Sequence, residues 1–208
     1  MSISRRTVLG FAGALLLLTF GPTSARAEGA ATGTVRKANA TLSQLLRKKA
    51  APGSPEEKSL AHDLTAKLSS FLDVDELGKR ALRDHWDKLT EPQKKEFSTL
   101  LRELVEASYV RALRSQLEYD VAYLSETAKD ESVRVATEVR PQKNGRKQVI
   151  SIDYVLHKDD SAWRVFDLVT DGVGLVENYR SQFNKVIAKE GVEGLFARMR
   201  KKKTDSAR

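Results

Sequence analysis

The chain has 208 residues, with 36 Lys and Arg against 28 Asp and Glu, a net charge of +8 and no cysteine. With 40% hydrophobic residues, this composition excludes a disordered chain and a protein that crosses a membrane several times. The lack of cysteine excludes disulfides, cysteine nucleophiles and thiolate zinc sites. Residues 1–27 carry +3 and residues 198–208 carry +5, so the body between them is neutral. A neutral body argues against nucleic-acid binding over a broad basic face.

Residues 1–27 have the pattern of a cleaved export signal. Arg5 and Arg6 give a positive start, and the apolar stretch 8–20 that follows is too short to span a bilayer comfortably. Small residues predict cleavage after Ala27. The paired arginines and the residues after them resemble a twin-arginine signal, with an ordinary secretory signal as the alternative. Both routes deliver the mature protein to the periplasm.

The first part of the mature chain has the sequence pattern of amphipathic helices. An apolar period of 3.6 residues predicts helices over residues 35–49, 55–85 and 92–116. Capping boxes begin at Ser54 and Thr90, each followed by a proline in the first turn, and Asp73 repeats the cap signal. We therefore expect amphipathic helices that bury one face each.

The apolar period then changes to 2, which is typical of strands. Four strands are predicted, over residues 119–125, 133–139, 148–157 and 162–170. Short turns, one of them at Asn144-Gly145, predict an antiparallel meander. A helix resumes after Gly172, breaks at Gly191 and ends in a short amphipathic helix. The order predicts an α+β fold with a single domain, 28–197, and a flexible basic tail, 198–208.

The usual catalytic motifs are missing, so we expect no enzyme, cofactor or metal site. There is no nucleophile elbow or phosphate-binding loop, and the histidines lack metal-ligand spacing. Asp153 and Asp167 lie on neighbouring predicted strands and are candidate acids or bases. We favour the simpler interpretation, in which Asp153 faces solvent and Asp167 forms hydrogen bonds at a sheet edge.

The apolar faces of the sheet and the longest helix allow two interpretations. They form a packed core, which composition and period alone favour, or they enclose a cavity for acyl chains. Each methylene buried in such a cavity contributes about 0.8 kcal/mol. The candidate lipid-binding residues on these faces are Leu101, Leu104, Val105, Tyr109, Val133, Val135, Val139, Ile150, Ile152 and Tyr154.

The segment from Trp163 to Phe183 resembles the MlaC family of periplasmic phospholipid-binding proteins, which belongs to a system that maintains outer-membrane lipid asymmetry. The hexapeptide Asn178-Tyr179-Arg180-Ser181-Gln182-Phe183 carries most of the resemblance. Further matching positions are Trp86, Thr90, Gln93, Phe97, Tyr109, Gly191, Gly194 and Leu195. The chain departs from the family at Gly174, where serine is expected, and this weakens a helix N-cap.

The resemblance implies a cone similar to nuclear-transport-factor-2-like domains, with added helices and a lipid pocket. It also implies that Tyr179 and Phe183 line or close that pocket. The function implied is a monomeric shuttle that carries phospholipid between an outer-membrane lipoprotein–porin complex and an inner-membrane ABC transporter with a lipid-binding ring.

Two other functions remain open from the residues themselves. One is a small enzyme on the same cone, with Asp153 or Asp167 as base. The other is a non-catalytic periplasmic adaptor whose apolar faces are all packed. The basic tail either contacts anionic lipid headgroups transiently or is simply solvated.

Overall fold

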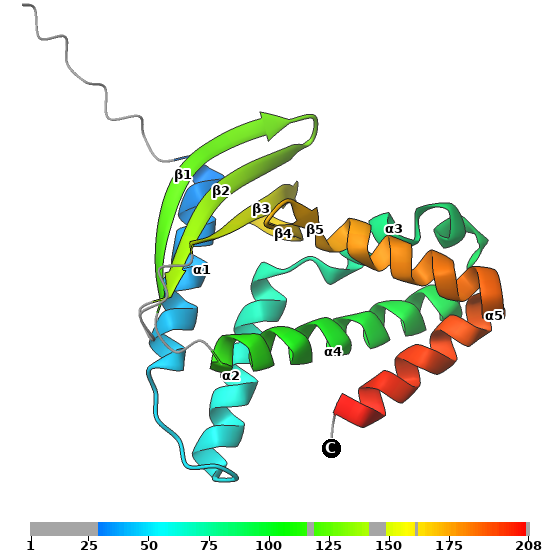
Figure 1. Ribbon diagram of the computed structural model, residues 1–208, viewed down its shortest axis with the longest axis horizontal. Helices are drawn as coiled ribbons and strands as arrows, with labels where there is room; N and C mark the ends of the chain where they lie inside the picture. Colours follow the sequence, from blue (N-terminus) through cyan, green and yellow to red (C-terminus); the bar gives the residue numbers. More distant parts are fainter. Residues whose placement is uncertain (1–28, 116–118, 142–148, 161, 207–208) are drawn as a thin grey trace, which may run out of the picture.

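The computed structural model describes residues 29–115, 119–141, 149–160 and 162–206 (Figure 1). The predicted export signal and the predicted Asn144-Gly145 turn lie outside these residues. The helices are α1 (Ala30–Leu46), α2 (Pro55–Phe71), α3 (Val74–Leu82), the 3-10 helix η1 (Arg83–Lys88), α4 (Glu91–Ser115) and α5 (Leu175–Ser206). The strands are β1 (Tyr119–Lys129), β2 (Ser132–Pro141), β3 (Ile150–Asp159), β4 (Ala162–Thr170) and β5 (Val173–Gly174).

The strands form one antiparallel sheet in the order β1-β2-β3-β4-β5. The predicted α+β fold and antiparallel meander are confirmed, with one strand more than the sequence predicted. The additional strand, β5, has only two residues, so no alternation of apolar and polar residues reveals it. It follows a tight turn in which Asp171 and Gly172 have φ angles of 46° and 85°.

Three helices begin where the cap signals predict them. The cap hydrogen bonds run from Glu57 N to Ser54 Oγ (3.1 Å), from Glu76 N to Asp73 Oδ1 (2.9 Å) and from Gln93 N to Thr90 Oγ1 (3.4 Å). Because the Asp73 cap starts a new helix, the segment predicted over residues 55–85 is divided into α2, α3 and part of η1.

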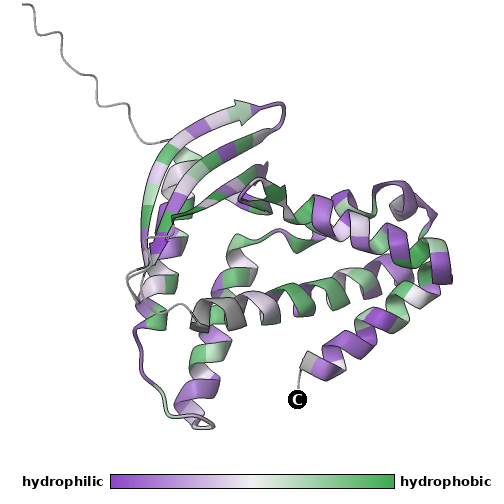
Figure 2. Ribbon diagram, viewed as in Figure 1, coloured by the Kyte–Doolittle hydropathy of each residue, from purple (hydrophilic) through white to green (hydrophobic). Residues whose placement is uncertain are grey.

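Helices cover one face of the sheet, and this arrangement positions the site. Helix α1 lies along β1 and β2, and α2 and α4 cross each other below the sheet in the view of Figure 1. Apolar and polar residues alternate along the longer strands (Figure 2). Alternate side chains of a strand share one face, and on β2, β3 and β4 the apolar set is buried against the helices. Val135 on β2 and Leu156 on β3 are fully buried on this face.

A second packed region lies where α3, α4 and α5 meet. Phe97 on α4 is fully buried, and its ring centroid lies 6.2 Å from that of Trp86, 5.5 Å from that of Phe183 and 6.5 Å from that of Phe196. Gly78 on α3 allows this approach, because a Cβ there would lie 2.9 Å from side-chain atoms of Phe97 and Leu101.

Helix α5 is kinked at Gly191, whose φ of 69° only glycine adopts easily. Beyond the kink, the chain returns along α4. Arg200 lies 2.7 Å from Glu96, and Lys203 lies 2.7 Å from Glu103. The sequence predicted a flexible tail from residue 198, whereas residues 198–206 are helical and belong to α5. The ion pairs of Arg200 and Lys203 with α4 hold this part of the helix in place.

The first turn of α5 is capped from the sheet. Asp167 Oδ1 on β4 accepts a hydrogen bond of 3.1 Å from Val176 N. A Cβ at Gly174 would lie 2.9 Å from Asp167 Oδ2, so the glycine leaves room for this carboxylate. Asp167 thus supplies the cap that the expected serine at position 174 would have formed.

Candidate functional site

A cavity of about 320 Å³ lies between the helix-covered face of the sheet and helices α1, α2 and α4. Its described walls are mostly apolar and include no charged side chain. The lining residues are Asn39, Leu42, Leu68, Phe71, Leu72, Tyr109, Tyr119, Val139, Ile150, Ile152, Tyr154, Leu168 and Thr170. A space of this kind accepts an apolar ligand without desolvating a charge.

Strand register brings the sheet side of the cavity together. Tyr154 on β3 is opposite Leu168 on β4, and Ile152 is opposite Thr170. Ile150 is opposite Val139 on β2. Because opposed residues share a face of the sheet, these pairs form a continuous wall.

The helices complete the cavity with one or two residues each. Asn39 and Leu42 come from α1, Leu68 and Phe71 from α2, and Tyr109 from α4. The Phe71 ring lies 6.1 Å from the Tyr154 ring, so α2 closes the cavity against β3.

Polar atoms at the cavity wall form one buried network. Asn39 Nδ2 donates to the Tyr123 hydroxyl (3.1 Å), and the Tyr154 hydroxyl donates to Asn39 Oδ1 (3.3 Å). Burial raises the pKa of Tyr154 and of Tyr109 well above the ordinary value, so both phenols stay neutral hydrogen-bond donors. The site is therefore uncharged but not wholly apolar.

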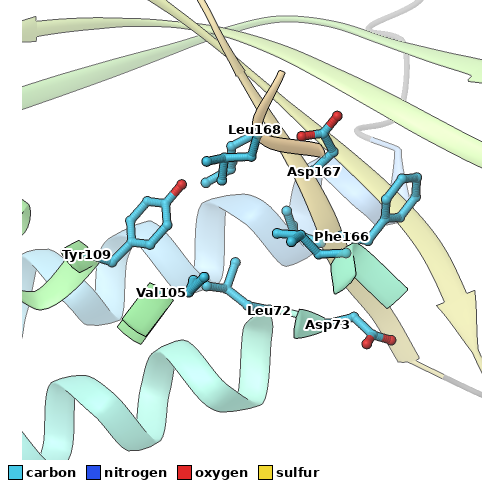
Figure 3. A pocket seen from close by; sticks show the side chains of 10 residues that line it. Leu72, Asp73, Val105, Tyr109, Phe166, Asp167 and Leu168 are labelled. Atoms are coloured by element: carbon cyan, nitrogen blue, oxygen red, sulfur yellow. The ribbon is translucent and has the colours of Figure 1, made fainter. Parts of the chain in front are cut away.

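A second space, of about 10 Å³, adjoins the first and shares Leu72, Tyr109 and Leu168 with it. Figure 3 shows Val105 and Tyr109 directed toward this space and the carboxylates of Asp73 and Asp167 directed away from it. The space is about the size of one water molecule, so it is too small for an acyl chain.

Five of the twelve residues predicted to bind lipid line the large cavity: Tyr109, Val139, Ile150, Ile152 and Tyr154. Val105 borders the small space, and Leu101, Leu104 and Val135 are buried in the packed core. Val133 packs partly buried against that core. Tyr179 stacks on Phe183 at 5.4 Å, and Phe183 contacts Phe97, so both lie in the packed region of α3, α4 and α5 and neither is among the described residues that line the cavity. The long stripe of α4 is thus divided, since its first turns face α3 and α5 and its later turns reach the cavity.

Eight lining residues were not among the predicted site residues. They are Asn39, Leu42, Leu68, Phe71, Leu72, Tyr119, Leu168 and Thr170. Leu42, Leu68 and Phe71 lie on the apolar stripes of their helices, so a signal existed for them, but no pattern indicated which stripes would meet the sheet. Asn39 has no sequence signal, because its role depends on tyrosines from distant strands.

The two candidate catalytic aspartates do not line the large cavity. Asp153 alternates with Ile152 and Tyr154, which places it on the opposite face, and its Oδ2 lies 3.1 Å from Arg134 Nε. Asp167 caps α5 as described above. Both carboxylates therefore have structural partners away from the site.

Metal binding and membrane insertion are two further kinds of site that the described residues bear on. No three His, Asp or Glu side chains of the described ranges are grouped so that they hold a metal ion. No helix in the part of the chain that the structure describes has the length and hydropathy needed to cross a bilayer.

The fold and the site define an α+β domain with an uncharged cavity between sheet and helices. Residues 36–201 match the MlaC protein family, and the chain belongs to that family. A solved structure with the same fold is that of a phospholipid-binding protein from Ralstonia solanacearum in complex with a phospholipid. It is 24% identical to this chain, has a TM-score of 0.73 and is matched over 86% of this chain and 100% of its own. No curated protein sequence matches the chain significantly.

Proposed function

We propose that the protein binds a phospholipid in the 320 Å³ cavity and carries it through the periplasm. The observation that carries this proposal is the cavity itself. Protein interiors are normally close-packed, so an apolar space of this size indicates room for an apolar ligand. Membership of the MlaC family supports the proposal, as does the fold shared with a protein whose structure contains a phospholipid.

The chemistry of the lining indicates which end of a phospholipid enters the cavity and which end stays outside. Acyl chains gain about 0.8 kcal/mol for each methylene that they bury. A phosphate inside would lose its hydration without gaining a cation, because the described lining has none. The tails therefore occupy the cavity and the headgroup stays at its opening. The predicted lipid contacts that this arrangement retains are Tyr109, Val139, Ile150, Ile152 and Tyr154.

The transport role extends this binding activity. We infer exchange of the lipid with an outer-membrane lipoprotein–porin complex on one side and an inner-membrane ABC transporter on the other. Family membership supports these partners, and the predicted export signal supports the periplasmic location. Transfer requires the cavity to open, because buried chains are otherwise released slowly.

The test is native mass spectrometry of residues 28–208 purified from a periplasmic extract, followed by solvent extraction of the bound material. A mass excess equal to one phospholipid is the expected result. A protein that stays free of lipid after incubation with phospholipid vesicles would refute the binding proposal. Transport is tested separately, by transfer of a labelled phospholipid between two vesicle populations.

A further inference from the structure

Our further inference concerns Asn39 and rests on the proposed function. We propose that the Asn39 carboxamide donates a hydrogen bond to a carbonyl oxygen of the bound lipid. The cavity then prefers ester-linked acyl chains to ether-linked alkyl chains of the same length.

Asn39 is a polar residue in an apolar setting. It lies on α1, is only 7% exposed and lines the cavity. The neighbouring α1 residue of the wall is Leu42, one helical turn further on. A buried carboxamide costs free energy unless its donors and acceptor have partners, so its hydrogen bonds need a full account.

Only part of that hydrogen-bonding capacity is used. Tyr154 donates to Asn39 Oδ1, and one N–H of Nδ2 is donated to Tyr123. A carboxamide has two N–H donors. Among the described residues, the second N–H has no acceptor, and Asn39 lines the cavity.

The missing partner must be an acceptor that enters the cavity. An acyl ester carbonyl is a good acceptor, whereas methylenes are not acceptors at all. A phosphate is a strong acceptor, but the uncharged lining disfavours it. The ester carbonyl is therefore the lipid group whose chemistry fits this donor, and the bond fixes where along the cavity the chains begin.

The test offers the full mature chain an equimolar mixture of dipalmitoyl phosphatidylglycerol and its dihexadecyl ether analogue. Native mass spectrometry then measures the ratio of the two complexes. We expect an ester excess of about two- to tenfold in the wild type, which is the range that one net hydrogen bond supplies. In Asn39→Leu, the ratio should fall to about one.

Two matched variants distinguish a loss of ester recognition from a general loss of lipid binding or of stability. Leu42→Ala removes apolar wall from the same helix, so binding of both lipids should weaken by the same factor and the ratio should persist. Glu126→Ala loosens the start of α1, where Glu126 Oε2 accepts a 2.8 Å hydrogen bond from Thr32 N, without contacting the cavity, and should also keep the ratio.

The outcomes distinguish this inference from the function on which it rests. Equal binding of both lipids by the wild type, as expected if a water satisfies Asn39, would overturn the inference and leave lipid binding intact. An ester excess that persists in Asn39→Leu, or disappears in Glu126→Ala, would overturn it as well. Binding of neither lipid would refute the proposed function, and the inference with it.

Discussion

Asp73 Oδ2 lies 2.9 Å from His157 Nε2, which joins the N-cap of α3 to the end of strand β3. The backbone strengthens this junction, because Asp73 N donates to Val165 O at 2.7 Å. Arg164 Nη2 donates to Leu72 O at 2.6 Å. The corner between α2 and α3 is thus held on β4, beside the cavity wall at Leu72, so any release motion that lifts this corner must break these contacts.

The first prediction concerns pH. Burial alone would raise the pKa of Asp73, but hydrogen bonds from Glu76 N and His157 and the charge of Arg164 lower it overall. A carboxyl whose pKa is lower in the folded state adds stability above its unfolded value of 3.8, and this stability is lost as the pH falls through the lowered value. Asp73→Asn retains a cap but should show a weaker loss of Tm below about pH 4. Parallel Tm curves for the two proteins would contradict this assignment.

The second prediction tests the cavity by filling it. Ile152 lines the cavity, and Ile152→Trp should weaken phospholipid binding about tenfold, since excess side-chain volume in a packed apolar site costs about 1–3 kcal/mol. The matched control is Leu124→Trp, because Leu124 is 58% exposed on β1 and lies outside the cavity lining. Lipid content after purification measures both variants. Equal loss in the two would show that the effect does not come from the cavity.

The third prediction concerns the attachment of α1 to the sheet. Glu126 Oε2 accepts hydrogen bonds from Thr32 N (2.8 Å) and Thr32 Oγ1 (2.7 Å), and so caps a helix whose own N-cap residue, Gly29, has no side chain. Glu126→Ala should cost about 1 kcal/mol, as other cap losses do, and should speed amide exchange in the first turn of α1. Glu131→Ala, in the exposed β1–β2 turn, is the control and should leave that exchange unchanged.

The fourth prediction tests the cap of α5 by a double-mutant cycle. Asp167→Ala should cost about 1 kcal/mol through loss of the hydrogen bond to Val176 N. Gly174→Ser should also destabilise, because its Cβ would lie 2.9 Å from Asp167 Oδ2. In the double variant the serine has room to form the cap, so the combined cost should be less than the sum. Urea denaturation measures all three, and strict additivity would contradict the coupling.

The fifth prediction compares two glycines. Gly191 has a φ of 69°, and Gly191→Ala should destabilise by about 1 kcal/mol, because a Cβ is disfavoured in this region. Gly33 lies inside α1, where an added Cβ would have no neighbour within 4 Å, and Gly33→Ala should instead stabilise by a few tenths to 1 kcal/mol. Thermal unfolding measures both. Shifts of the same sign would show that backbone conformation does not decide the outcome.

The local structure of this protein follows from short-range patterns in the sequence. Cap signals at Ser54, Asp73 and Thr90 placed three helix starts, since a cap acts within one turn. The alternation along β2 to β4 determined which side chains share a face, so Ile150, Ile152 and Tyr154 were predicted together and lie together in the cavity wall. Strands that follow one another closely in the chain form antiparallel pairs, and the order of the strands in the sheet follows from this pairing.

Which apolar faces are packed and which enclose the cavity depends on how distant elements meet in the fold. Leu101 and Tyr109 lie on one stripe of α4, yet Leu101 is core and Tyr109 lines the cavity. A cavity exists where facing surfaces from different elements fail to fill a volume, and periodicity along one segment contains no information about that volume. Asn39 is the clearest case, because its partners Tyr123 and Tyr154 are 84 and 115 residues away in the chain and only the fold brings them together.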